Sequence, residues 1–179
     1  NTKIHFASVT NGNISLLKIF KDCGWGIHAN TPGDIYLALK AGFSPENVVY
    51  SGSNLSSEEI AQLLNWGITT FNLDSINQLQ VFCEVYQKID LNSFEEIKLG
   101  FRLNLPEITG DSRIGIRPNE FTEAVEIASK ANLKISGLHF YRGTGTNATK
   151  AFTQVINQVI ETAKLLPDWQ YLDFGGGFG

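Results

Sequence analysis

The sequence contains no methionine at any of its 179 positions and only two cysteines. Cys23 and Cys83 each stand alone, without other metal-ligand residues at close spacing, so we expect structural thiols in a reducing compartment. No apolar run approaches the roughly 20 residues of a membrane span. The N-terminus also lacks the basic and apolar regions of a secretory signal. These absences predict a cytoplasmic protein with no membrane partner.

The sequence has no excess of basic residues either. The chain has 14 Lys and Arg against 18 Asp and Glu, a net charge of -4. Binding to nucleic acid needs clustered basic side chains, so we expect no nucleic-acid partner. The 42% hydrophobic and 18% charged residues are typical of a globular domain.

The sequence does contain a regular alternation of short apolar strands and amphipathic helices. Strands are predicted at residues 3–9, 26–29, 47–51, 69–73, 98–104, 134–141 and 171–174. Helices are predicted at residues 14–23, 32–41, 57–66, 75–88, 120–131 and 149–166. Thr31-Pro32-Gly33-Asp34 and Ser56 with Glu59 have the chemistry of helix N-termini.

Seven strands joined by six helices favour a (β/α) barrel, and an open doubly wound sheet is the alternative. The alternation alone does not distinguish them. A complete barrel typically needs about 250 residues, so this chain would lack one strand and one helix. We found no internal linker and expect residues 1–179 to form one truncated α/β domain.

Polar and glycine residues gather where the predicted strands end, which is where α/β folds bind ligands. They include Asn11, His28, Ser51, Gly52, Asp74, Arg102, Asn104, His139, Tyr141, Thr144, Gly175, Gly176 and Gly177. The backbone N–H groups of three consecutive glycines can close on a phosphate, and the Thr144 hydroxyl could add a donor. Alternatively, the glycines form only a turn, His139 and Tyr141 are core residues, and His28 flanks a helix at the surface.

A dinucleotide site is a further interpretation of the glycines. That fingerprint opens a helix in the first strand–helix unit. Here the glycines follow the seventh predicted strand, and the first strand has none after it except Gly12. The position therefore argues against a dinucleotide site.

Two segments carry a specific resemblance. "GLHFYRGTGT" is similar to GLHxHxGS and "LDFGGGFG" to LDxGGGxG, while "FNLDSINQL", "GFRLN" and "SRIGI" are similar to further motifs in the same order. The chain thus resembles the barrel domain of pyridoxal-phosphate-dependent decarboxylases of the alanine-racemase-like fold, the diaminopimelate, ornithine and arginine decarboxylases. The resemblance implies a (β/α)8 TIM barrel, incomplete here, that binds pyridoxal 5'-phosphate. It also implies a homodimer whose full-length chain adds an eighth strand and a C-terminal β domain.

The resemblance implies roles for particular residues. Gly175, Gly176 and Gly177 match the phosphate-binding glycines and Thr144 the phosphate-binding serine. Arg102 matches an arginine near the cofactor ring, and we expect His139 beside the cofactor as well. The ring-stacking histidine of the family falls on Tyr141, which can still stack. An active-site aspartate falls on His28, which changes the local charge and leaves the substrate open.

The Schiff-base lysine of the family poses a separate problem. An ungapped match to its "YAVKAN" motif puts Val9 at the lysine position. The match improves if one residue is missing between Val9 and Thr10. A lysine bonded to its cofactor is a modified residue that a sequence of standard residues would omit, and modified methionines would be omitted likewise. We therefore expect a lysine there, and no printed residue is assigned as catalytic.

The expected activity is decarboxylation of an amino acid with a second polar terminus, diaminopimelate first, then ornithine, lysine or arginine. One alternative is a catalytically inactive regulator of the same fold, which would follow if Val9 and Thr10 are truly adjacent. An amino-acid racemase is the other alternative, although racemases usually lack the "GGGFG" pattern.

Overall fold

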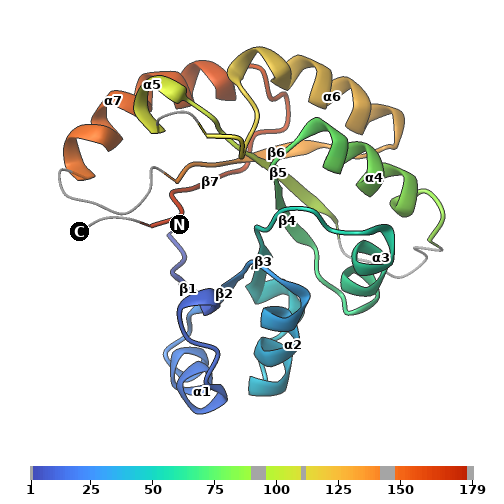
Figure 1. Ribbon diagram of the computed structural model, residues 1–179, viewed down its shortest axis with the longest axis vertical. Coiled ribbons are helices and arrows are strands. Elements are labelled where there is room, and N and C mark those ends of the chain that lie inside the picture. The colour runs from blue at the N-terminus through green and yellow to red at the C-terminus, as the bar shows by residue number, and fades with distance from the viewer. Residues whose placement is uncertain (1, 90–95, 110–111, 142–147, 177–179) are drawn as a thin grey trace.

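The computed structural model describes residues 2–89, 96–109, 112–141 and 148–176, without the side chains of 109 and 148–152. Within these ranges, seven parallel strands form one sheet in sequence order. The strands are β1 (His5–Ala7), β2 (Gly26–Ala29), β3 (Val48–Tyr50), β4 (Thr70–Leu73), β5 (Lys98–Arg102), β6 (Ile135–His139) and β7 (Tyr171–Asp173). The sheet curls into an open barrel with the helices on its outside (Figure 1).

A helix follows each of β1 to β6, and the six helices predicted from the sequence are all present. The helices are α1 (Ile14–Asp22), α2 (Pro32–Ala41), α3 (Ser57–Asn65), α4 (Ile76–Tyr86), α5 (Pro106–Thr109), α6 (Phe121–Lys130) and α7 (Ala148–Ala163). Short 3-10 turns cover Ser8–Thr10, Pro45–Asn47 and Pro118–Glu120. The α/β barrel prediction is confirmed, and the doubly wound alternative is wrong because consecutive strands are neighbours throughout the sheet.

Several strands are shorter than predicted, because their backbone pairing with neighbouring strands stops before the apolar run of residues ends. The first strand ends at Ala7, where the Thr10 hydroxyl donates to the Ala7 carbonyl at 2.8 Å and the chain turns. The fifth ends at Arg102, since Leu103 pairs instead with Ile116 in an isolated bridge. Neither α5 nor the 3-10 turns were among the predicted elements.

Helix termini confirm the capping prediction. Thr31 and Ser56 each accept a hydrogen bond from the backbone N–H three residues on, and Asp34 and Glu59 return one. Gly42 ends α2 in the left-handed region, with φ at 92°. Such reciprocal bonds satisfy donors that the first helical turn leaves free, so they fix where each helix leaves the sheet.

The two faces of the sheet differ in composition. The outer face is apolar: Phe71 of β4 packs edge-on against Phe82 of α4, and Phe101 of β5 against Phe121 of α6. Alternate residues on the same strands face the barrel interior. There the side chain of Tyr171 of β7 lies against Gly137 of β6 and Gly100 of β5, where a larger residue would overlap it. The interior therefore holds glycine and polar groups in place of a wholly apolar core.

We expect Gly137→Ala to be strongly destabilising. A β-carbon at Gly137 would overlap the ring of Tyr171, which is held between β6 and β4. Displacing that ring also breaks its hydrogen bond to Asn72, so we expect a loss of about 2–4 kcal/mol in the free energy of unfolding. Urea denaturation measures the change.

Gly33→Ala is the matched control, because its β-carbon would meet only the Thr31 hydroxyl, at 3.5 Å, in the first turn of α2. Its stability should match or slightly exceed that of the parent protein. A Gly137→Ala variant as stable as Gly33→Ala would show that Tyr171 can move without cost.

Candidate functional site

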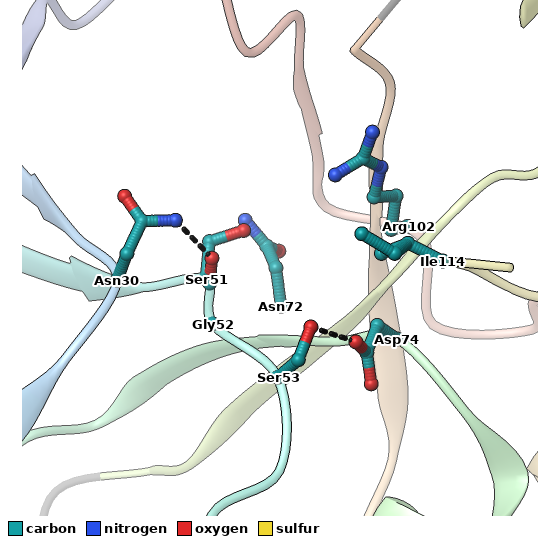
Figure 2. Close-up of a pocket in the computed structure, with 8 residues that line it drawn as sticks. All are labelled: Asn30, Ser51, Gly52, Ser53, Asn72, Asp74, Arg102 and Ile114. Carbon is teal, nitrogen blue, oxygen red and sulfur yellow. Dashed lines mark hydrogen bonds between the residues drawn. The ribbon is translucent and has the colours of Figure 1, made fainter. Parts of the chain in front are cut away.

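A pocket of about 150 Å³ opens at the carboxyl ends of the strands (Figure 2). It is lined by Asn30, Ser51, Gly52, Ser53, Asn72, Asp74, Arg102 and Ile114. The Asn30 side-chain amide donates to the Ser51 carbonyl at 2.7 Å, and the Ser53 hydroxyl donates to the Asp74 carboxylate. The structure thus brings together Ser51, Gly52, Asp74 and Arg102, as their strand-end positions predict.

Arg102 provides the cation of this pocket. Burial lowers the pKa of Arg102, and the nearby Asp74 and Tyr141 oppose that shift. An arginine remains charged under such conditions. Its guanidinium carbon lies 5.4 Å from the centre of the Tyr141 ring, a cation–π distance. Arg102 and Tyr141 therefore lie together at the carboxyl edge of the sheet, where they offer a positive charge and an aromatic surface.

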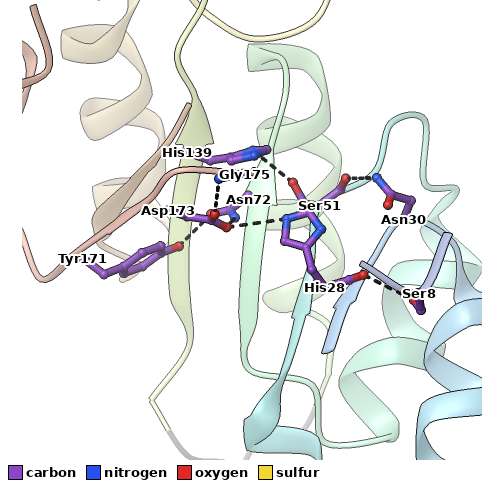
Figure 3. A network of polar contacts seen from close by, with 9 residues as sticks. All are labelled: Ser8, His28, Asn30, Ser51, Asn72, His139, Tyr171, Asp173 and Gly175. Atoms are coloured by element: carbon purple, nitrogen blue, oxygen red, sulfur yellow. Dashed lines mark hydrogen bonds and ion pairs between the residues drawn. The ribbon is translucent and has the colours of Figure 1, made fainter. Parts of the chain in front are cut away.

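Behind the pocket, the partly buried carboxylate of Asp173 organises a polar network (Figure 3). One oxygen of Asp173 accepts from the Asn72 side-chain amide at 2.9 Å, and the other accepts from the Gly175 backbone N–H at 2.8 Å. The Tyr171 hydroxyl donates to the Asn72 side-chain oxygen at 2.9 Å. The network links β4 to β7 across the barrel and holds the start of the glycine turn.

Two histidines complete the network. His28 Nε2 lies 3.5 Å from Asp173 Oδ2, and His139 Nδ1 lies 3.1 Å from the Ser51 hydroxyl. The two ring centres are 5.5 Å apart. The buried Nε2 atom of His28 therefore faces the Asp173 carboxylate, whereas the buried Nε2 atom of His139 has no hydrogen-bond partner among the described residues. His28 is thus part of the barrel interior, and its surface interpretation is wrong.

The charges of this network are set by burial and by contacts. Burial lowers the pKa of His139 to about 4, although the nearby Asp173 opposes that shift, so the imidazole is neutral at pH 7. Burial would raise the pKa of Asp173, but the contact with His28, the His139 imidazole and the Gly175 N–H outweigh it. The pKa of Asp173 accordingly lies well below its usual range, and the carboxyl is ionised.

The glycine turn after β7 has the backbone shape that the sequence predicts for an anion cradle. Gly175 and Gly176 have φ of 64° and 98°, in the region that favours glycine. A β-carbon at Gly175 would come within 2.7 Å of His139 Nε2, whereas nothing lies within 4 Å of one at Gly176. The space beside Gly176 and the cation of Arg102 are compatible with a phosphorylated ligand. Thr144 and Gly177 lie outside the described residues.

The sequence analysis missed Asp173, Asn72 and Tyr171 of the polar network, and it also missed Asn30, Ser53 and Ile114 of the pocket lining. Asp173 is an acid inside an otherwise apolar strand, and acids are seldom buried without a partner. That signal could have identified it. Its partner Asn72 is 101 residues away in sequence and carries no comparable signal.

A curled parallel barrel with a polar interior and a glycine turn at its strand ends defines a barrel-type ligand-binding domain. The chain belongs to the pyridoxal-dependent decarboxylase family: the model of that family's pyridoxal binding domain matches residues 1–179. This match confirms the resemblance that the motifs indicate, and with it pyridoxal phosphate as the cofactor of the family.

Known proteins similar to the chain agree with this assignment. Diaminopimelate decarboxylase of Methanothermobacter thermautotrophicus is 28% identical, with 99% of this chain and 43% of the relative covered. That of Aquifex aeolicus is 30% identical, with 98% and 44% covered. The crystal structure of the Helicobacter pylori enzyme complexed with L-lysine superposes with a TM-score of 0.80 at 25% identity, covering 96% of this chain and 46% of that one. The chain therefore spans less than half the length of these relatives.

None of the helices in the described part of the chain is both long and apolar enough to cross a bilayer.

The neutral state of His139 predicts a pH-dependent stability. Between pH 6.5, the usual histidine pKa, and about pH 4, the unfolded chain binds a proton at this position that the folded chain does not. The free energy of unfolding should therefore fall as the pH is lowered through this range, by about 3 kcal/mol at most from this residue. Urea denaturation at several pH values, in the parent protein and in His139→Gln, measures this contribution. It is the difference between the two proteins in the slope of the free energy of unfolding against pH. Parallel curves for the two proteins would contradict it.

Proposed function

We propose that the full-length protein is a pyridoxal-phosphate-dependent amino-acid decarboxylase. Diaminopimelate is the first substrate candidate, followed by ornithine, lysine and arginine. The observation that carries the proposal is the family match over the whole chain, together with the glycine turn at the end of β7. Relatives named diaminopimelate decarboxylase support the order of substrates.

The residues of this chain offer a place for each part of the cofactor. We infer that the backbone of Gly175, Gly176 and Gly177 and the hydroxyl of Thr144 hold the phosphate. Arg102, Tyr141 and His139 would adjoin the ring, and His28 would adjoin the reacting end. When bound, pyridoxal phosphate supplies an electron sink for the loss of CO2. The chain would contribute the anion cradle, a fixed cation and an ionised, partly buried carboxylate.

The lysine that bonds the cofactor is proposed to lie between Val9 and Thr10. In support, these residues form the turn at the carboxyl end of β1, where Val9 is 61% exposed. The neighbouring Ser8 hydroxyl donates to the His28 carbonyl at 3.2 Å. A long side chain leaving this turn would therefore start next to the end of β2, which carries His28.

We further propose a cytoplasmic homodimer. The eighth strand and a C-terminal β domain would come from residues outside this chain. The greater length of the relatives supports this view, as does the absence of pairing between β1 and β7 in the described sheet. Such unpaired strand edges promote association unless they are covered.

The proposal predicts that the full-length protein, loaded with pyridoxal phosphate, releases CO2 from one of the four amino acids. Gly176→Val should lose the cofactor and the activity together, because its side chain would enter the open space beside the turn. Cofactor absorbance after gel filtration and CO2 release measure the two effects.

Gly24→Val is the matched control. Gly24 also has a positive φ, 75°, with nothing within 4 Å of a β-carbon, but it lies at the end of α1. The backbone strain is thus comparable, and cofactor and activity should remain. Cofactor retained by Gly176→Val at parental affinity would exclude the glycine turn as the phosphate site. No CO2 from any of the four substrates by a cofactor-loaded protein would contradict the activity.

A further inference from the structure

A second pocket, of about 290 Å³, opens at the end of the barrel opposite the candidate site. Its lining includes His5 and Gly26, which are the first residues of β1 and β2. Lys3 and Cys23 also line it, and both are exposed. Solvent therefore reaches the amino ends of these two strands, and His5 lies between that solvent and the barrel interior.

The His5 ring lies inside the barrel, below His28. His5 of β1 pairs with Gly26 of β2, and Ala7 pairs with His28. Because alternate residues of a strand share a face, His5, Gly26 and His28 all face the interior, where His28 meets Asp173. The His5 ring covers Gly26, since a β-carbon there would lie 2.6 Å from His5 Nε2. The step from this level to His28 is about 6.6 Å along the strand, a gap that one bridging water can span.

The three histidines differ in their electrostatic surroundings. Burial lowers the pKa of His5; Asp173 opposes that shift, whereas His28 and Lys3 add to it. His5 is therefore neutral at pH 7 and able to accept a proton, and it senses both members of the His28–Asp173 pair. His139 is different, because burial lowers its pKa to about 4 and keeps its imidazole neutral. The groups suited to move a proton near neutral pH are thus His5 and His28.

We propose that His5 and His28 form a proton relay from the amino-end pocket to the candidate site, with Asp173 as its fixed counter-charge. An imidazole takes up a proton at its free nitrogen and can release one from either nitrogen. Because His28 Nε2 faces the Asp173 carboxylate at 3.5 Å, Nδ1 is left to take up the incoming proton. The ionised Asp173 then lies beside the positive charge until His28 gives a proton up at the strand ends.

The use of this proton rests on the decarboxylase function proposed above. Loss of CO2 breaks the bond between the α-carbon and the carboxylate carbon and leaves the electron pair on the α-carbon. That carbon takes up one proton, so each turnover converts one amino acid and one proton into one amine and one CO2. Solvent supplies the proton, and both histidines end the cycle neutral. A route through the barrel interior delivers it while the substrate covers the carboxyl ends of the strands.

The test uses the cofactor-free full-length protein labelled with 15N-histidine, and it measures by NMR how fast the ring N–H proton of His28 exchanges with water. His28→Gln identifies the signal. We expect His5→Gln to slow the exchange about ten-fold or more, because the relay loses its first imidazole. Cys23→Ser is the matched control, since Cys23 lines the same pocket without lying on the route, and its exchange rate should equal that of the parent protein. Equal rates in His5→Gln and the parent protein would overturn the proposal.

His5→Ala separates a lost relay from altered packing. Removal of the ring leaves room beside Gly26 that is continuous with the pocket. Added imidazole should therefore restore fast exchange at His28 in His5→Ala and leave the rate of the parent protein unchanged. Slow exchange that imidazole does not reverse would show that His5 acts only by packing, and it would overturn the relay.

The cofactor-loaded protein distinguishes the relay from the proposed function. In His5→Gln we expect a lower kcat, an unchanged KM and a larger solvent isotope effect. Release of CO2 at the parental rate, with unchanged exchange at His28, would refute the relay and leave the proposed decarboxylase intact. Slow exchange that imidazole rescues, in a protein that releases no CO2, would support the relay and contradict the proposed function alone.

Discussion

The site depends on the compensation of one partly buried negative charge, that of Asp173. A carboxylate in the barrel interior is stable only if donors surround it. Asn72 and the Gly175 N–H supply them directly, and His28 lies 3.5 Å away. Because these groups come from β4, from β2 and from the turn after β7, one carboxylate fixes the relative positions of three segments. The glycine turn therefore has a defined shape before any ligand arrives.

The interior needs small residues to make room for this network. Tyr171 spans the barrel only because Gly100 and Gly137 face it, since a β-carbon at either would overlap the tyrosine. The hydroxyl of Tyr171 then orients Asn72, which in turn donates to Asp173. The outer face meanwhile buries its aromatic residues against the helices. Apolar packing thus lies between the outer face of the sheet and the helices, whereas polar groups occupy the barrel interior.

Much of the fold could be predicted because its signals are local. The helix at Pro32–Ala41 and the strand at Gly26–Ala29 were predicted at their observed bounds, since a capping box and a terminal glycine mark the helix. The end of β1 was not predicted, because the apolar pattern gives no sign of the turn in which the Thr10 hydroxyl donates to the Ala7 carbonyl. The short helix Pro106–Thr109 was not predicted either. In the site, motifs pointed to His28, Arg102 and the glycines. The motifs gave no role to Asp173, which lies close before those glycines. Its pairing with Asn72 depends on how the barrel closes.

We propose that this barrel binds its cofactor covalently through a lysine between Val9 and Thr10. Borohydride reduction of the native full-length protein, followed by proteolysis and peptide sequencing by mass spectrometry, tests it most directly. We predict a peptide in which one lysine carrying a pyridoxyl phosphate group stands between Val9 and Thr10. A peptide with Val9 bonded directly to Thr10 would contradict the account, and it would favour a catalytically inactive protein of the same fold.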